Sequence, residues 1–175
     1  MTTRTPGQTP GETPGSLSER HEHFVPLVTS IGEAEAAVGG SSAQRLLVLT
    51  GALEESMAHE LMPHAVGEGR SVFPVLRRVT GSELQAIEMT KQHRELARLT
   101  DELDRVRLEL RTAGAPAERD LGRILHQLRD ILGEHLAAEE EVCFTVLKQE
   151  LSAEQAHEVC AAMERATEEV RRAYE

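Results

Sequence analysis

Aromatic residues are scarce in this chain. Its 175 residues include three phenylalanines, one tyrosine and no tryptophan. Hydrophobic residues still make up 39% of the sequence, so Leu, Val, Ile and Ala must supply the core. Such a core suits packed helices better than a β-sheet, because strands favour aromatic and β-branched side chains. Composition and length therefore predict one all-α domain.

Cysteine is also rare, and several sequence motifs of enzymes are missing. Cys143 and Cys160 are too few for a disulfide framework, and they lack the C-x-x-C spacing of zinc and redox sites. We expect both to be buried, inert thiols. The sequence contains no Gly-rich phosphate loop and no nucleophile elbow. It therefore gives no support for a serine, cysteine or phosphate-handling enzyme.

Positive charge is in short supply, and there is no long apolar run. The formal net charge is -11, so nucleic acid or an anionic membrane would repel the protein. No apolar segment approaches the roughly 20 residues that span a bilayer, and the N-terminus lacks the layout of a signal peptide. We expect a cytoplasmic protein that binds neither nucleic acid nor membrane, and whose ligands are small molecules or cations.

Caps and breaks divide the chain into a tail and five helices. Residues 1–15 are mainly Thr, Pro and Gly, which predicts a disordered tail. Residues 16–150 are expected to form an up-down-up-down four-helix bundle, and residues 151–175 an accessory helix packed on its outside. Ser followed three residues later by Glu or Gln predicts capping boxes for three helices. The predicted helices run from Ser16 to the Gly39-Gly40 pair, from Ser42 to about Val79, from Ser82 (with Gln85) to the break at 113–116, onward to about Glu150, and from Ser152 (with Gln155).

The third and fourth predicted helices have polar residues within their apolar stripes. The stripe of the fourth contains Leu121, Leu125, Leu128, Leu132, Val142 and Val146. Its two gaps are His135 and Glu139, which lie one turn apart on the same face. In the third helix, one step backward along the stripe of Leu96, Leu99, Leu103, Val106 and Leu110 reaches His93. We therefore expect His93, His135 and Glu139 to face the core.

The first two helices add further polar groups to the predicted core. In the second, the register continues through Leu46, Leu53, Met57, Glu60, His64, Glu68, Val72 and Val75. In the first, His21 lies one step before Phe24 on the buried face. Four other histidines fall away from these stripes and are expected at the surface: His23, His59, His126 and His157.

Each long helix thus places a histidine on its buried face, and two of them add a glutamate. Burying four histidines with two carboxylates is costly unless something neutralises them, and a bound cation does so most simply. Imidazole with carboxylate suits Fe, Mn, Zn or Co, whereas the absence of thiolate ligands argues against copper(I) and iron-sulfur clusters. The residues therefore predict a metal site.

The order of these residues resembles the hemerythrin-like family of HHE cation-binding domains. It reads as a lone His, a His-x3-Glu pair, a second lone His and a second pair. The flanking strings are similar too: HEHFVP at His21, HAVGEGRSVFP at His64, KQHRELARLTDEL at His93 and EHLAAEEEVCF at His135. The resemblance covers residues 16 to about 149. It implies a bundle that holds two non-haem irons, bridged by carboxylates and an oxo group.

By this resemblance, Glu68 and Glu139 would bridge the irons, with the four histidines in outer positions. The oxygen carriers of the family have another His one turn after the third-helix histidine, where this chain has Ala97. Two alternatives follow: one iron has an open, water-filled position, or Glu60 completes the ligand set.

Several functions fit such a centre. The first is a di-iron module that binds or senses dioxygen, peroxide or nitric oxide, in a pocket walled by Phe24, Val28, Met57, Met89, Leu96 and Leu132. The second is an enzyme that decomposes peroxide or nitric oxide at an open iron. The third is iron buffering or iron-responsive regulation, in which metal binding stabilises the fold. The fourth is a metal-free helical interaction protein.

Overall fold

The computed structural model describes residues 22–112 and 114–174. This part of the chain is helical and contains no strand, which confirms the all-α prediction. The elements are α2 (Val25–Ala37), α3 (Ala43–Ser56), η1 (Met57–Leu61), α4 (Met62–Thr80), α5 (Leu84–Glu109), α6 (Ala115–Ala138), η2 (Glu139–Phe144), α7 (Thr145–Glu150) and α8 (Ala153–Tyr174). The predicted tail over 1–15, the Ser16 cap and His21 lie outside the described residues. The domain limits at 16, 150 and 151 remain predictions.

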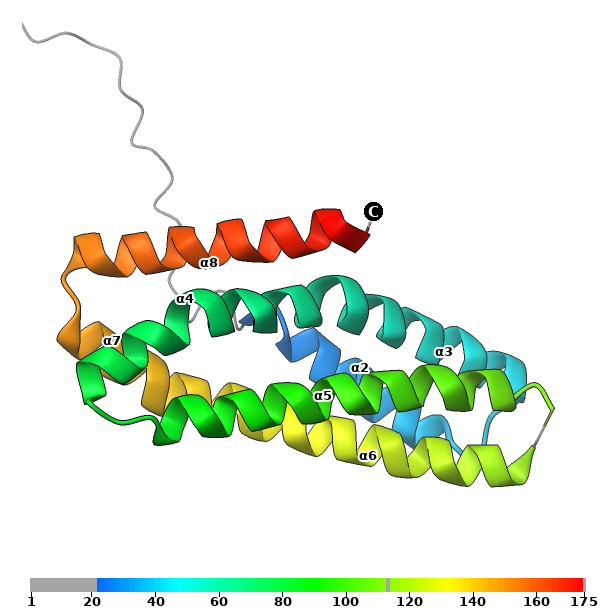
Figure 1. Ribbon diagram of the computed structural model, residues 1–175. Helices are drawn as coiled ribbons and strands as arrows, with labels where there is room; N and C mark the ends of the chain where they lie inside the picture. Colours follow the sequence, from blue (N-terminus) through cyan, green and yellow to red (C-terminus); the bar gives the residue numbers. More distant parts are fainter. Residues whose placement is uncertain (1–21, 113, 175) are drawn as a thin grey trace, which may run out of the picture.

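Two long rods and two single helices surround the core. α3, the π-helical turn η1 and α4 follow one another without a break, and so do α6, the π-helical turn η2 and α7. Figure 1 shows these rods running beside α5 and α2, with α8 lying along the outer side of α4. The outside position predicted for the last helix is therefore confirmed.

The helix ends follow the predicted signals with two corrections. Ser42 caps α3 by accepting a hydrogen bond from the Arg45 N–H at 3.3 Å. At α8, the Gln155 side chain accepts from the Ser152 N–H and the Ser152 hydroxyl accepts from the Gln155 N–H, as a capping box requires.

The capping box predicted for Ser82 and Gln85 was wrong. α5 begins at Leu84, so Glu83 rather than Ser82 is its capping residue. The Ser82 hydroxyl accepts from the Leu84 N–H at 3.2 Å, and the Gln85 side-chain oxygen has no hydrogen-bond partner in the described part of the chain.

The first helix is interrupted where it was predicted to be continuous. Residues 23 and 24 form a turn, and α2 starts at Val25 with Pro26 in its first turn. Proline has no N–H to donate to the carbonyl four residues earlier, and its ring clashes with that carbonyl in a continuous helix. A helix that restarts just before Pro26 avoids both problems.

The core consists of two apolar clusters that meet at a polar layer. On the α3–α4 rod the first cluster ends at Leu61 and the second begins at Val72. On α5 the boundary lies between Met89 and Leu96, and on the α6–α7 rod between Leu132 and Cys143. The polar residues singled out from the sequence, from His64 to Glu139, occupy these intervals.

The turn η1 changes which residue of the α3–α4 rod faces the core. The α-helical register predicted Glu60 on the buried stripe, but Leu61 is 2% exposed and takes that place. A π turn contains more residues than an α turn. The residue one turn after Met57 on the buried face is therefore Leu61 instead of Glu60. Pro63 explains the location, since its missing N–H leaves the His59 carbonyl without an α-helical donor. That carbonyl accepts from Nε of Arg171 on α8 at 3.2 Å.

The turn η2 causes the same correction on the α6–α7 rod. The predicted stripe continued through Val142 and Val146. Val146 is partly buried and packs against the second cluster, but Val142 is 37% exposed. Cys143, Phe144 and Leu147 are buried instead. Here too the wider turn moves the buried face on by one residue.

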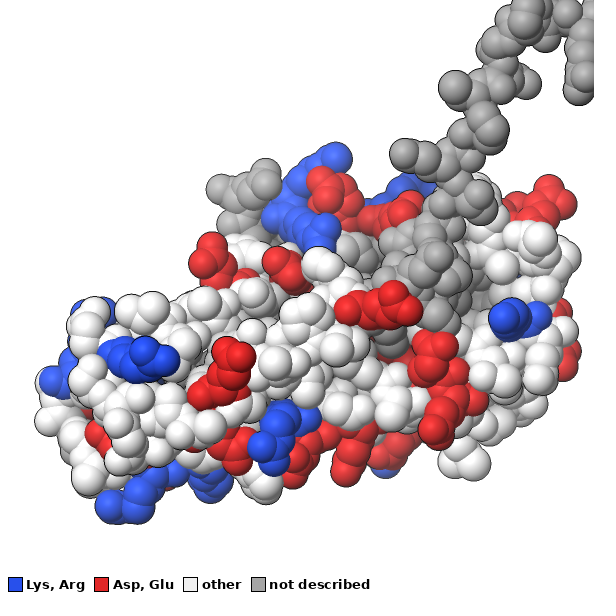
Figure 2. Space-filling model, turned by 180° about the vertical axis from the view of Figure 1, so that it is seen from behind, with Lys and Arg blue, Asp and Glu red and all other residues white. Residues whose placement is uncertain are grey.

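No described helix has the length and apolar character needed to cross a membrane. On the face shown in Figure 2, acidic and basic side chains are interspersed, and neither sign forms a continuous surface.

Candidate metal centre

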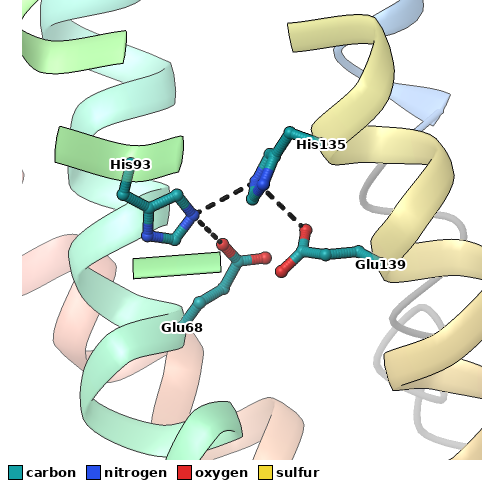
Figure 3. Close-up of side chains that lie close together, drawn as sticks. All are labelled: Glu68, His93, His135 and Glu139. Carbon is teal, nitrogen blue, oxygen red and sulfur yellow. Dashed lines mark hydrogen bonds and ion pairs between the residues drawn. The ribbon is translucent and has the colours of Figure 1, made fainter. Parts of the chain in front are cut away.

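Four side chains from the two rods and α5 converge in the polar layer. Their potential ligand atoms, one from each side chain, all lie within 4.8 Å of one another. The four residues are Glu68 on α4, His93 on α5, His135 on α6 and Glu139 at the start of η2. Figure 3 shows the two imidazoles and two carboxylates pointing toward a common centre.

The contacts within this cluster join each histidine to a carboxylate. Nε2 of His93 lies 3.2 Å from Oε2 of Glu68, and Nε2 of His135 lies 3.3 Å from Oε2 of Glu139. The two Nε2 atoms face each other at 3.1 Å. At most one proton fits between two neutral ring nitrogens at this distance, so the second nitrogen presents its lone pair.

His64 extends the cluster on the opposite side of Glu68. Its Nε2 lies 2.9 Å from Oε1 of Glu68, whereas Oε2 of the same carboxylate faces His93. The two oxygens of Glu68 thus serve different histidines. Such a carboxylate can hold one cation with each oxygen.

The burial of the two carboxylates is the strongest indication that these residues suit a metal ion. Glu68 and Glu139 are both 0% exposed. Two negative charges out of water need positive charge close by, which a divalent cation among neutral imidazoles supplies. The donor set of nitrogen and oxygen without thiolate suits iron, manganese, zinc or cobalt. The residues present therefore fit a metal ion.

One functional contact was not predicted from the sequence. Nδ1 of His135 donates to the Gln92 side-chain oxygen at 3.1 Å. An amide oxygen can only accept, so this bond places the proton on Nδ1 and directs the Nε2 lone pair into the cluster. Gln92 is half-buried beside His93 on α5, and no spacing rule distinguishes it from an ordinary polar residue.

Aromatic rings enclose two of the histidines. The Phe24 ring meets His64 edge to face with centroids 4.8 Å apart, and the Phe73 ring stacks on His93 at 5.3 Å. Five residues of the predicted pocket wall are buried, namely Phe24, Met57, Met89, Leu96 and Leu132, while Val28 is partly buried.

The structure separates Glu60 from the cluster. Its carboxylate lies 3.2 Å from Nε2 of the exposed His23, and its side chain is 46% exposed. His59, His126 and His157 are exposed, as predicted for all three. His126 pairs with Asp130 and Glu35 at the surface. His21 is not among the described residues.

Cys143 follows Glu139 by four residues on η2. Burial raises the pKa of its thiol to about 12, and the nearby carboxylates of Glu139 and Glu68 add to the shift. The thiol therefore stays protonated at neutral pH in the metal-free protein, in agreement with the prediction of an inert cysteine.

A family model agrees with this arrangement. The model of the hemerythrin HHE cation-binding domain matches residues 15–121. The chain belongs to this family. The matched span of the hemerythrin-like domain includes His64, Glu68 and His93 and ends before His135 and Glu139. His135 and Glu139 lie outside the matched span. It is the structure that brings them next to Glu68 and His93. No curated protein and no solved structure matches the chain.

Proposed function

We propose that this hemerythrin-like protein is a non-haem di-iron protein that binds or senses dioxygen or a related small oxidant, such as peroxide or nitric oxide. The observation that carries the proposal is the buried cluster of Glu68, His93, His135 and Glu139. Its two imidazoles and two carboxylates match the donor chemistry of non-haem iron.

The proposed ligand set divides between two ions that share Glu68. Glu139, which the family resemblance makes a second bridge, is assigned here to one ion because its carboxylate pairs with His135 at 3.3 Å. One ion would take His93, His135, Glu139 and Oε2 of Glu68. The other would take Oε1 of Glu68, His64 and the predicted ligand His21. The support for two ions is that the two oxygens of Glu68 face different histidines, at 2.9 and 3.2 Å.

Iron in such a site supplies reversible electron transfer and a position where a small oxidant binds. The chain provides the surroundings. Phe24 packs edge to face on the ring of His64 and Phe73 stacks on the ring of His93, and these contacts help to fix the orientation of both rings. Gln92 orients His135 through its Nδ1 hydrogen bond. Ala97 contributes no ligand, which leaves room for an exogenous molecule.

One observation favours the alternative that the centre turns over its oxidant. A cleft of about 650 Å³ opens between α3–η1–α4 and α5, and both His93 and Ala97 line it. We call it the α4–α5 cleft. An open route from solvent suits turnover of peroxide or nitric oxide. Rapid mixing of the reduced, iron-loaded protein with each oxidant distinguishes the two functions, since a reversible binder shows no catalytic consumption.

Metal loading is the decisive experiment. The protein is purified without added metal, reconstituted anaerobically with ferrous iron, and assayed for iron per chain and for its visible spectrum before and after exposure to air. We expect about two irons per chain and an absorption change on oxidation. Glu68→Gln should lose both ions because it is shared, whereas Glu139→Gln should lose mainly one.

A surface variant and a competing metal complete the design. Glu141→Gln, on an exposed residue of η2, should leave the iron content unchanged. A chain that takes up no iron under any of these conditions would refute the proposed function. If the chain instead takes up zinc or manganese and shows no response to air, it has a metal site. The proposed role in oxidant binding would then be refuted.

A further inference from the structure

The α4–α5 cleft is larger than a diatomic gas or hydrogen peroxide requires. Its volume of about 650 Å³ lies within the roughly 300–1,000 Å³ of pockets that bind organic molecules. Small side chains create much of this space, because three alanines line the walls from facing elements. The apolar wall consists of Ala58, Met62, Ala65, Val66 and Ala97.

Two hydroxyl groups of α5 also line the cleft. The hydroxyls of Thr90 and Thr100 donate to the carbonyls of Ala86 and Leu96, at 2.6 and 2.8 Å. With their hydrogens engaged, both oxygens keep lone pairs that can accept a hydrogen bond. The cleft thus offers two acceptors among apolar walls.

His93 supplies a ring nitrogen that can donate or accept, depending on its tautomer. Its Nε2 faces Glu68 and His135, and Figure 3 shows the other ring nitrogen pointing away from the cluster. Nδ1 makes no hydrogen bond to the described residues, and the His93 side chain is 12% exposed. When a cation takes the Nε2 lone pair, the neutral ring carries its proton on Nδ1, which is then a donor. In the metal-free protein His135 presents its lone pair to Nε2 of His93, so Nε2 carries the proton and Nδ1 accepts.

The charges at the rim disfavour anions. Glu54, Asp101 and Asp104 line the cleft together with Arg94. Arg107 lies 3.2 Å from Glu54 and 3.5 Å from Asp104, which compensates part of this negative charge. An anionic molecule entering the cleft would meet these carboxylates and gain little from the apolar walls.

We propose that the α4–α5 cleft binds an uncharged organic hydroperoxide, with its apolar body against the alanine-rich wall and its O–OH end toward His93 and the two threonine hydroxyls. The O–OH group is both a donor and an acceptor, which the polar lining can satisfy. The proposal deepens the function proposed above by assigning a substrate class to that site, and it rests on that function for its biological meaning.

Binding to the full-length, metal-free protein tests the assignment. The probe is 2-phenyl-2-propanol, an uncharged tertiary alcohol that carries an aryl and alkyl body, titrated into protein with isotope-labelled Ala and Met methyl groups. We expect saturable binding, nuclear Overhauser contacts from the probe to Ala97 and Met62, and displacement by cumene hydroperoxide. Benzoate, an anion with the same aromatic ring, should bind at least about tenfold more weakly.

Two variants locate the site. Ala97→Leu fills the cleft from α5 and should weaken probe binding by at least about tenfold. Ala52→Leu, at an exposed position of α3, should change it by less than about twofold. No saturable binding, contacts to other methyl groups, an unaffected Ala97→Leu, or equal binding of benzoate would each overturn the proposal. Because the test uses metal-free protein, its outcome is separate from that of iron loading.

Discussion

Gln92 accepts a hydrogen bond from Nδ1 of His135 at 3.1 Å, while Nε2 of the same ring lies 3.3 Å from Glu139. The two contacts are on opposite sides of one imidazole. Gln92 therefore acts on the candidate centre through His135 by fixing its tautomer and the direction of its lone pair.

The first prediction concerns this positioning contact. Gln92→Leu removes the acceptor and should weaken ferrous or cobaltous ion binding by about 10–100-fold. Gln92→Glu keeps an acceptor for Nδ1 and should retain the affinity. Anaerobic chelator competition measures the affinity, and the visible spectrum of the cobalt-loaded protein reports the geometry around the metal.

Gln149→Leu serves as the matched control, since Gln149 is exposed on α7. It should leave both affinity and spectrum unchanged. If Gln92→Leu and Gln149→Leu behave alike, Gln92 has no positioning role.

The second prediction separates the stability of the protein from its metal affinity. Glu139 is fully buried, so its charge is costly when no cation is bound. Glu139→Gln removes that charge and should stabilise the metal-free protein by about 1–3 kcal/mol, while lowering metal affinity. Urea unfolding of metal-free protein and metal content per chain measure the two effects. A destabilised metal-free variant would show that the carboxylate has structural partners that outweigh its desolvation cost.

The third prediction tests the register set by η1. Leu61 is 2% exposed, and Leu61→Ala should cost about 2–5 kcal/mol in the free energy of unfolding. Glu60→Ala should cost less than about 0.5 kcal/mol, because Glu60 pairs with His23 near the surface. Metal content should not change in Glu60→Ala. A loss of metal there would make Glu60 the ligand that completes the set.

The fourth prediction concerns the packing of α8 on α4. A Cβ atom added at Gly67 would lie 2.3 Å from the Thr167 hydroxyl oxygen and 3.0 Å from the Met163 carbonyl oxygen. Gly67→Ala should therefore destabilise the protein by about 1–3 kcal/mol. At Gly69 a Cβ meets nothing within 4 Å, so Gly69→Ala should stabilise the helix by up to about 1 kcal/mol. Thermal unfolding of the two variants checks the contrast. Equal effects on stability would mean that α8 does not pack closely against α4 at Gly67.

The fifth prediction follows from the raised pKa of Cys143. In the metal-free protein this pKa is about 12 instead of 9.0, so the thiolate fraction at pH 8 is about a thousandfold smaller than for an ordinary thiol. Iodoacetamide should modify Cys143 at least that much more slowly than a free thiol, and faster as the pH rises toward 12. Mass spectrometry of timed samples measures the rate at each cysteine. Rapid modification at pH 8 in the folded state would contradict the prediction.

Sequence periodicity predicted most of the helices and most of the candidate centre. Helical faces depend on local spacing, so spacing alone assigned His64, Glu68, His93, His135 and Glu139 to the buried side. Glu60 and Val142 were placed wrongly for one shared reason. A π turn inserts a residue into the register, and an α-helical count carried across it selects the neighbouring position.

What the sequence by itself determined was the helical class, the helix ends at Ser42 and Ser152, and the pairing of His with Glu one turn apart. Each of these depends on residues within about one turn of each other. The tertiary structure decided the contact of Gln92 with His135, the sharing of Glu68 between two histidines and the opening of the α4–α5 cleft. These features join residues from different helices, and their geometry depends on how the rods pack rather than on any local spacing.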